Sequence, residues 1–120
     1  MAKPPPWPSD LRFNKAAAEL RIRFDDGYEG AIGYELLRVE SPSAETKGHG
    51  AEQPPPPTKK HKVGVVGAEP VGRYALRIRF DDGHNTGLYT WAYLRELCEQ
   101  KEARMTKYLA QMNKLGLSRD

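Results

Sequence analysis

The sequence predicts an α+β fold, in which two antiparallel β-meander units pack together with a short helix and a C-terminal helix. The main observation is a repeat, because the eight residues LRIRFDDG occur at positions 20–27 and again at 76–83. In each copy Leu, Ile and Phe alternate with Arg, which is typical of a strand with one buried face. Asp-Asp-Gly then supplies the tight turn of a hairpin. Each copy therefore predicts a strand, a turn and a returning strand.

The first unit follows a proline-rich segment, residues 1–10, which we expect to be a disordered arm because proline fixes φ and removes a backbone donor. Three alanines at 16–18 favour a helix by propensity. The alternation of apolar and charged residues in 20–24 is the stronger signal, since a helix that extended to the turn at 25–27 would leave no room for the strand. The unit is thus expected to contain three strands and a short helix, at residues 11–13, 20–24, 28–33 and 34–38.

Residues 40–62 separate the two units and show no periodicity. They are rich in Ser, Pro, Gly, His and Lys, and they include four consecutive prolines at 54–57. We expect 41–49 to pack on the domain and 50–62 to form a mobile, polyproline-like loop. Docking of these prolines on an SH3-type groove is a second interpretation, but an ordinary loop is the favoured one.

The second unit repeats this plan and continues into a helix, with strands expected at residues 63–69, 73–80 and 84–89. Thr90 is a suitable N-cap for the helix, and Gly116 is a suitable stop. Between them apolar residues recur at helical spacing, namely Leu94, Leu97, Cys98, Met105, Tyr108, Leu109, Met112 and Leu115. The pattern predicts one long helix, or two with a break near 101–104. We expect a domain at 11–98 and a helical extension at 99–120.

The composition restricts the class of protein and partner. The 120 residues include 19 Lys and Arg against 16 Asp and Glu, a net charge of +3, which is weak support for a nucleic-acid partner. The single cysteine cannot form an internal disulfide, which fits a reducing compartment. The first residues lack the apolar stretch of a signal peptide, and no run approaches the roughly 20 apolar residues of a membrane span. We therefore expect a monomeric cytoplasmic protein without membrane contact.

The residue patterns do not point to catalysis, so we expect a protein that is not an enzyme. The glycine-rich run at 63–72 imitates a dinucleotide-binding fingerprint. However, Glu69 stands where a glycine would approach the pyrophosphate, and a strand follows instead of a helix. Cys98 lies beside Leu94 and Leu97 on one predicted helix face, which favours a small buried hydrophobe over a nucleophile.

Four arginines of the repeat are expected on the polar side of their strands, namely Arg21, Arg23, Arg77 and Arg79. Such a stripe could bind phosphate. A solvated face paired with nearby Asp and Glu is the favoured interpretation, because the aromatic residues typical of a nucleic-acid surface do not accompany the arginines.

Two polar segments, one in each unit, provide the candidate ligands. If the units pack with pseudo-symmetry, Glu45, His49 and His84 would meet, and their carboxylate and imidazole groups suit a divalent metal such as Zn²⁺ or Fe²⁺, or a small ligand. Turn chemistry explains His84 equally well, since polar residues are common in and after such turns. The same segments form the predicted surface for a protein partner, made of Ser41, Ser43, Asn85, Thr86, Tyr89 and Trp91.

Four runs of the chain carry a resemblance to known proteins. They are FDDG from Phe24, LLRVESPSAETKGH at 36–49, VGRYALRIRFDDGHNTGLYTW at 71–91 and YLREL at 93–97. Together they resemble the gamma-butyrobetaine hydroxylase-like N-terminal domain family, small bacterial proteins of unknown function. The resemblance covers roughly residues 11–98, and its motifs are specific in combination.

The resemblance implies a non-catalytic role. In the hydroxylases this domain precedes the catalytic domain and looks like a zinc-binding module with three cysteines and one histidine. Here Ser41, Ser43 and Thr46 stand in the run equivalent to the cysteines and only His84 matches the histidine, which speaks against a structural zinc. Similar domains are fused to Mrp-type ATPases of iron–sulfur cluster assembly, which implies an accessory or interaction role. The resemblance transfers no catalytic residue.

Overall fold

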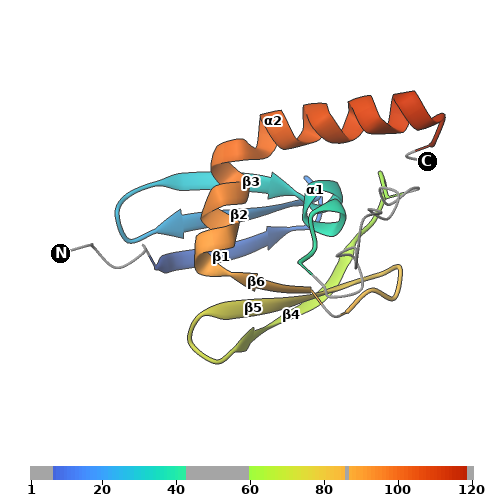
Figure 1. Cartoon of the computed structure of the whole chain (residues 1–120). Helices are drawn as coiled ribbons and strands as arrows, with labels where there is room; N and C mark the ends of the chain where they lie inside the picture. Colours follow the sequence, from blue (N-terminus) through green and yellow to red (C-terminus); the bar gives the residue numbers. More distant parts are fainter. Residues whose placement is uncertain (1–6, 43–59, 86, 119–120) are drawn as a thin grey trace, which may run out of the picture.

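The computed structural model describes residues 7–42, 60–85 and 87–118. Within them the chain forms two three-stranded antiparallel sheets, with strand orders β1-β2-β3 and β4-β5-β6, and two helices (Figure 1). The first unit consists of β1 (Pro8–Asn14), β2 (Glu19–Phe24), β3 (Glu29–Gly33) and α1 (Tyr34–Val39). The second consists of β4 (Val65–Val71), β5 (Ala75–Phe80), β6 (Gly87–Thr90) and α2 (Trp91–Leu115). The predicted α+β fold with two meanders and two helices is confirmed.

The two units repeat each other well beyond the eight identical residues. In both, the first strand carries an irregularity opposite the end of the second strand, between Pro8 and Asp10 in β1 and between Val65 and Gly67 in β4. In both, a helix starts directly after the third strand. The fourth strand begins and ends two residues later than predicted, because Val63 packs into the core ahead of the ladder.

The alternating apolar residues of the repeat supply the centre of one shared core. The Leu, Ile and Phe side chains of β2 and β5 are all buried, as the period of two predicts, at Leu20, Ile22, Phe24, Leu76, Ile78 and Phe80. The first part of α2 crosses both sheets and contacts β3 and β6 (Figure 1). Buried Leu94 and Leu97 of this helix join the same core cluster. Burying apolar area from both sheets under one helix is what stabilises the pair of meanders.

The three alanines before β2 form a turn, so giving the strand pattern precedence over helix propensity was correct. The Asn14 side chain accepts a hydrogen bond from the backbone N–H of Ala17 at 3.0 Å, which is a local turn interaction. Ala18 has a positive φ of 53°, and its carbonyl accepts from the N–H of Tyr34 at 2.9 Å. That contact ties the β1–β2 turn to the start of α1.

Helix α2 has the predicted caps. The Thr90 hydroxyl accepts a hydrogen bond from the N–H of Tyr93 at 3.1 Å, and Gly116 ends the helix with a left-handed conformation at φ 66°. The alternative of two separate helices is wrong, although the continuous ribbon changes direction part-way along (Figure 1). The predicted boundary at position 98 therefore falls inside one helix. Neither described helix is long and apolar enough to cross a membrane.

Most of the predicted loop, residues 43–59, lies outside the described residues. Its last part is described, and one of its residues contacts the domain. The ammonium group of Lys60 lies 2.6 Å from a carboxylate oxygen of Asp82 in the β5–β6 turn. This ion pair links Lys60 to the second unit, and the mobile loop at 50–62 stays a prediction.

Candidate functional site

Each Asp-Asp-Gly turn is bound by the helix of the other unit. Arg38 in α1 places its Nε 2.8 Å from Asp82 in the β5–β6 turn. Arg95 in α2 places its Nη1 3.0 Å from Asp26 in the β2–β3 turn. The two arginines occupy equivalent positions, the fifth residue of their helices. The sequence shows the recurring Leu-Arg pair, but only the structure shows that its partners are exchanged between the units.

The second aspartate of each turn also organises the turn itself. Asp26 accepts a hydrogen bond from the N–H of Tyr28 at 3.2 Å, and Asp82 accepts one from the N–H of His84 at 3.0 Å. A carboxylate that accepts from the backbone two residues later is a common turn device. Turn chemistry therefore accounts for the position of His84.

The two sites differ in the residue that follows the turn. At the first, the guanidinium carbon of Arg95 lies 3.9 Å from the ring centroid of Tyr28, a cation–π contact. At the second, His84 takes the place of the tyrosine, and its Nε2 lies 2.8 Å from the hydroxyl oxygen of Ser41. The site at the β5–β6 turn is therefore more polar than the site at the β2–β3 turn, and we call it the polar site.

A glycine lets the other unit approach each site closely. A Cβ on Gly30 would come within 2.9 Å of the Sγ of Cys98, and a Cβ on Gly87 would collide with the hydroxyl of Ser41. Ser41 and Cys98 therefore occupy corresponding places, one polar and one apolar. Burial raises the pKa of Cys98 to about 11, so the thiol stays protonated at neutral pH and behaves as a small buried hydrophobe, as predicted.

Asp82 is an ionised carboxylate with its charge already compensated. Burial disfavours its charged form, but Lys60, the N–H of His84 and the Arg38 guanidinium outweigh this and lower the pKa of the carboxyl to about 2. The side chains of Arg38 and Asp82 are only 13% and 18% exposed. With two cations already bound to it, Asp82 is poorly suited to hold a metal cation.

The polar site includes two residues that were wrongly predicted on the partner surface. Tyr89 is fully buried, and its hydroxyl donates to the carbonyl of Leu37 at the end of α1. Burial raises the pKa of this phenol. Ser41 is only 5% exposed. Both therefore join α1 to the second sheet from the inside, and neither presents its side chain to a partner.

Replacing Tyr89 with phenylalanine is expected to lower the free energy of unfolding by about 1 kcal/mol, because the buried carbonyl of Leu37 loses its donor. Urea denaturation followed by circular dichroism measures this change. The matched control is Tyr74→Phe, since Tyr74 is 68% exposed. Equal losses in both variants would show that the Tyr89 hydroxyl does not hold α1 to the sheet.

Only one member of the predicted metal site can be placed. Glu45 and His49 lie outside the described residues, as do Ser43 and Thr86. In the part of the chain that the structure describes, no three His, Cys, Asp or Glu side chains form a group that could hold a metal ion. The metal site of Glu45, His49 and His84 stays a prediction.

The contact between Ser41 and His84 has the composition of a nucleophile and a base. The Ser41 hydroxyl is buried, however, and it is bordered by Gly87 and Tyr89. A nucleophile needs an open approach for its substrate, which this hydroxyl lacks. The pair is better explained as a hydrogen bond that joins the two units.

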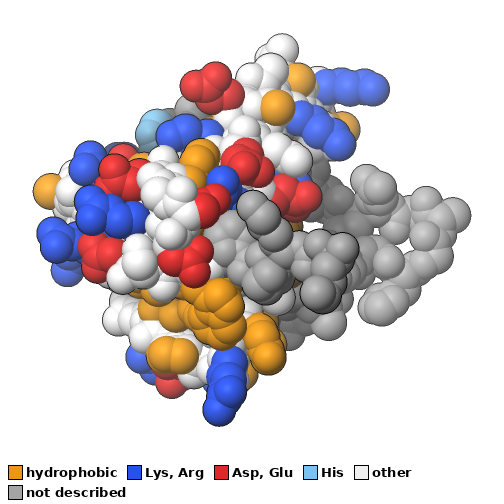
Figure 2. Space-filling view, turned by 90° about the vertical axis from the view of Figure 1, so that its left-hand side faces the viewer, with side chains coloured by type: hydrophobic (Ala, Val, Ile, Leu, Met, Phe, Trp, Pro, Cys, Tyr) orange, Lys and Arg blue, Asp and Glu red, His pale blue; other side chains and the backbone are white. Residues whose placement is uncertain are grey.

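Trp91, the remaining candidate for partner binding in α2, is half-buried against the core and belongs to an aromatic cluster at the surface. The ring centroid of Trp7 lies 5.8 Å from that of Tyr74 and 6.4 Å from that of Trp91. Trp7 is 40% and Tyr74 is 68% exposed. Figure 2 shows hydrophobic side chains gathered on this side of the molecule. We call Trp7, Tyr74 and Trp91 the aromatic patch.

The aromatic patch lies apart from the other predicted partner residues. Trp91 directly follows β6, whereas exposed Asn85 precedes it, so the two residues stand at opposite ends of this strand. The predicted single partner surface is therefore divided. Trp7 and Tyr74 were missed because 67 residues separate them in the chain and neither belongs to the repeat.

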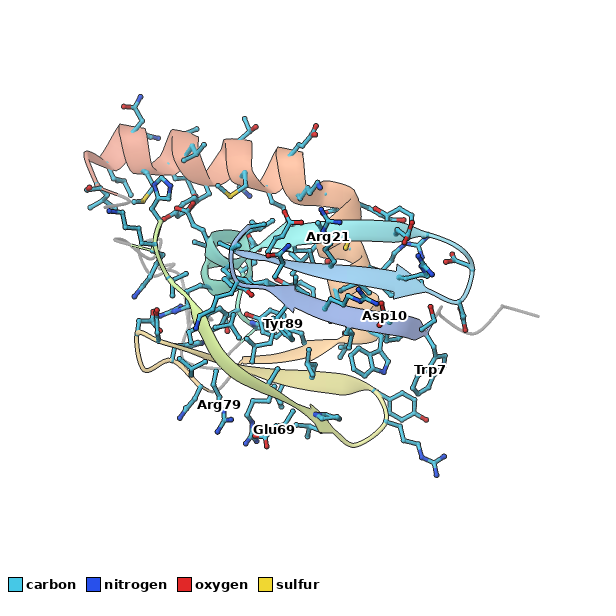
Figure 3. The ribbon with its side chains drawn as sticks, turned by 180° about the vertical axis from the view of Figure 1, so that it is seen from behind. Trp7, Asp10, Arg21, Glu69, Arg79 and Tyr89 are labelled. Carbon is cyan, nitrogen blue, oxygen red and sulfur yellow. The ribbon has the colours of Figure 1, made fainter. Side chains whose placement is uncertain are left out.

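The arginines of the repeat alternate with its buried residues and therefore lie on the outer faces of the sheets; Arg21 and Arg79 are labelled in Figure 3. Three of them have an acidic partner in the described structure, in the pairs Arg21–Glu19, Arg23–Glu29 and Arg77–Glu69. This agrees with the favoured interpretation of a solvated and paired face.

Comparison with known families identifies proteins to which the chain is similar. A family model described as "Gamma-butyrobetaine hydroxylase-like, N-terminal" matches residues 11–95, most of the chain. The chain belongs to this family. The gamma-butyrobetaine hydroxylase-like N-terminal resemblance predicted from the sequence motifs is thus confirmed. A comparison with curated proteins gives no match.

Solved structures of similar proteins share the fold of this family member. Two NMR solution structures are 43% and 38% identical to it, with TM-scores of 0.81 and 0.82. The first match covers 94% of this chain and 89% of the other, and the second covers 99% and 91%. A crystal structure from Acidithiobacillus ferrooxidans is 37% identical, with a TM-score of 0.61, and covers 75% of this chain and 90% of the other. It is described as a protein of unknown function in the DUF971 family.

Proposed function

We propose that this protein is a non-catalytic interaction domain, and that a protein partner binds the aromatic patch. The supporting observation is that Trp7, Tyr74 and Trp91 come from three separate segments and gather at the surface. Trp and Tyr are enriched in protein–protein interfaces, where they bury a large area with few rotatable bonds. A patch of this composition suits a protein partner.

The patch is held in place before any partner binds. The indole N–H of Trp91 donates to the carbonyl of Arg73 at 2.7 Å, so this ring has its polar requirement satisfied within the chain. The backbone of Trp7 exchanges two hydrogen bonds with Asp25, at 2.8 and 3.3 Å. A preformed patch loses less conformational entropy on binding than a mobile one, which favours affinity.

The partner that we propose to test first is an Mrp-type ATPase of iron–sulfur cluster assembly. This choice depends on the fusion of similar domains to such ATPases, and the aromatic patch supplies a surface for it. The role is accessory, because the domain contributes a binding surface and the ATPase contributes the chemistry.

Isothermal titration calorimetry with the purified ATPase from the same genome tests both parts of the proposal. Wild-type protein is expected to bind, and Tyr74→Ala is expected to bind at least tenfold more weakly, because an exposed aromatic side chain is lost from the patch. The matched control is Val66→Ala, since Val66 is 65% exposed and lies at the far end of β4. Absence of wild-type binding would reject the ATPase as partner. Undiminished binding by Tyr74→Ala would reject the patch.

A further inference from the structure

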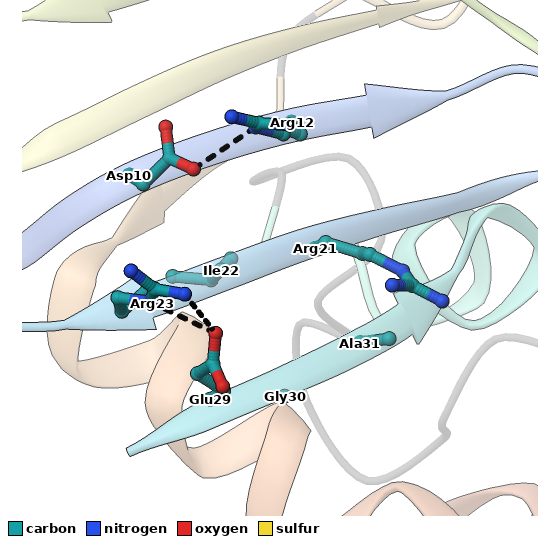
Figure 4. A pocket seen from close by; sticks show the side chains of 8 residues that line it. All are labelled: Asp10, Arg12, Arg21, Ile22, Arg23, Glu29, Gly30 and Ala31. Atoms are coloured by element: carbon teal, nitrogen blue, oxygen red, sulfur yellow. Dashed lines mark hydrogen bonds and ion pairs between the residues drawn. The ribbon is translucent and has the colours of Figure 1, made fainter. Parts of the chain in front are cut away.

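The outer faces of the two sheets carry two equivalent hollows with different charges. The hollow on the first sheet has a volume of about 490 Å³, and Arg12, Arg21 and Arg23 line it together with Asp10 and Glu29 (Figure 4). The hollow on the second sheet has a volume of about 400 Å³. The repeat allows the two to be compared position by position.

The first hollow is left open by a short side chain. In the first sheet Arg21 pairs with Ala31 across β2 and β3, and in the second sheet Arg77 pairs with Leu88 across β5 and β6. Leu88 occupies space over its sheet that the single methyl group of Ala31 does not. Room for a ligand therefore exists beside Arg21.

The main difference is a cross-strand pair of like charges. Arg12 and Arg21 stand directly opposite each other on β1 and β2. The equivalent residues of the second sheet are Glu69 and Arg77, which form an ion pair at 3.5 Å. Like charges directly opposite destabilise a sheet, and opposite charges stabilise it. The same fold thus uses a favourable pair in one unit and an unfavourable pair in the other.

The two arginines of the first sheet are not bridged by a shared acid. Each uses its Nε to contact the acid two positions before it in its own strand, Asp10 for Arg12 at 3.0 Å and Glu19 for Arg21 at 2.8 Å. Figure 4 shows their guanidinium groups directed away from each other. Both side chains are well exposed, at 79% and 66%, so a small ligand can reach them.

We propose that the first sheet binds a small oxyanion, a phosphate or carboxylate group, between Arg12 and Arg21. The planar guanidinium fork matches both groups, and a bound anion would turn the repulsion of the pair into attraction. Asp10 and Glu29 at the rim repel an extended polyanion such as a nucleic-acid backbone, while they can accept hydrogen bonds from hydroxyl or ammonium groups of a small ligand. This site is independent of the proposed protein partner, because it does not include the aromatic patch.

NMR titrations with inorganic phosphate and, separately, with acetate test the site at constant ionic strength. Saturable shifts are expected at the Nε–Hε groups of Arg12 and Arg21. The decisive variant is Arg12→Glu, which recreates the Glu–Arg pair of the second sheet and is therefore expected to fold. It should bind at least tenfold more weakly. The matched control is Lys107→Glu, which makes the same charge change on an exposed position of α2 and should leave binding unchanged.

Thermal unfolding gives a second readout that does not depend on the arginine resonances. Phosphate should raise the Tm of the wild type and of Lys107→Glu but not of Arg12→Glu. Binding of only one of the two anions would identify the group that the site recognises. Shifts that do not saturate, or equal affinity in Arg12→Glu and the wild type, would overturn the proposal and leave general screening of surface charge as the explanation.

Discussion

Replacing Arg38 with methionine is expected to lower the free energy of unfolding by about 1.5 kcal/mol, because the partly buried Asp82 carboxylate loses its charged hydrogen-bond partner across the two units. Methionine keeps most of the volume and the flexibility of the arginine stem, so the loss reports the charge and its hydrogen bond rather than a cavity. Lys60 still contacts Asp82 in this variant and limits the loss. Urea denaturation at pH 7 measures the change.

The matched control is Arg95→Met at the equivalent position of α2. Its partner Asp26 is 41% exposed, so water can solvate that carboxylate when the arginine is gone. A smaller loss is therefore expected, most of it from the contact of Arg95 with the ring of Tyr28. Equal losses in the two variants would contradict the view that burial of Asp82 makes its site the stronger link between the units.

The elements of the fold could be predicted because their signals are local. The alternation in LRIRF determines which side chains of β2 and β5 are buried, and Thr90 and Gly116 mark the ends of α2. The Arg38–Asp82 pair could not be predicted in this way, since 44 residues separate the partners. Repeat symmetry alone is equally compatible with each helix binding its own turn, and the choice depends on how the units pack.

The error at Tyr89 comes from the register of the second hairpin. In β6 the side chains alternate, so Gly87 and Tyr89 are buried while Leu88 and Thr90 are exposed. Tyr89 also stands opposite Leu76, a buried position of the repeat strand. At the turn the N–H of Phe80 donates to the carbonyl of His84 at 2.9 Å, and an unbroken register from this pair would have set Leu88 opposite Leu76 and turned Tyr89 outward. The register shifts by one residue before β6, and this shift is what places Tyr89 in the core.

The surface of the molecule was harder to predict than its core. The aromatic patch joins residues from β4–β5, the start of α2 and the segment before β1, and no local pattern connects them. The difference between the Arg12–Arg21 pair and the Glu69–Arg77 pair likewise appears only once the strand register is known. Both proposals depend on contacts between distant segments, which composition and periodicity do not contain.

The contribution of Asp82 to stability is expected to disappear in acid, with a window determined by its lowered pKa. In the folded protein the pKa of this carboxyl is about 2, whereas an unfolded chain has a value of about 3.9. Because the folded value is the lower one, the stabilisation of about 2 kcal/mol is complete above about pH 5. It is lost as the pH falls towards 2, with about half gone near pH 3.

The difference in the free energy of unfolding between wild type and Asp82→Asn isolates this effect from the other carboxylates. Urea denaturation at pH 6 and pH 3 should show the difference shrink by about half, since asparagine cannot titrate and a protonated aspartate resembles it. The matched control is Asp26→Asn, whose carboxylate occupies the equivalent turn with greater exposure and should give a weaker dependence on pH. A difference that stays constant between the two pH values would mean that Asp82 titrates as in the unfolded chain. The ion pairs with Arg38 and Lys60 would then be too weak to hold α1 and the segment before β4 against the β5–β6 turn.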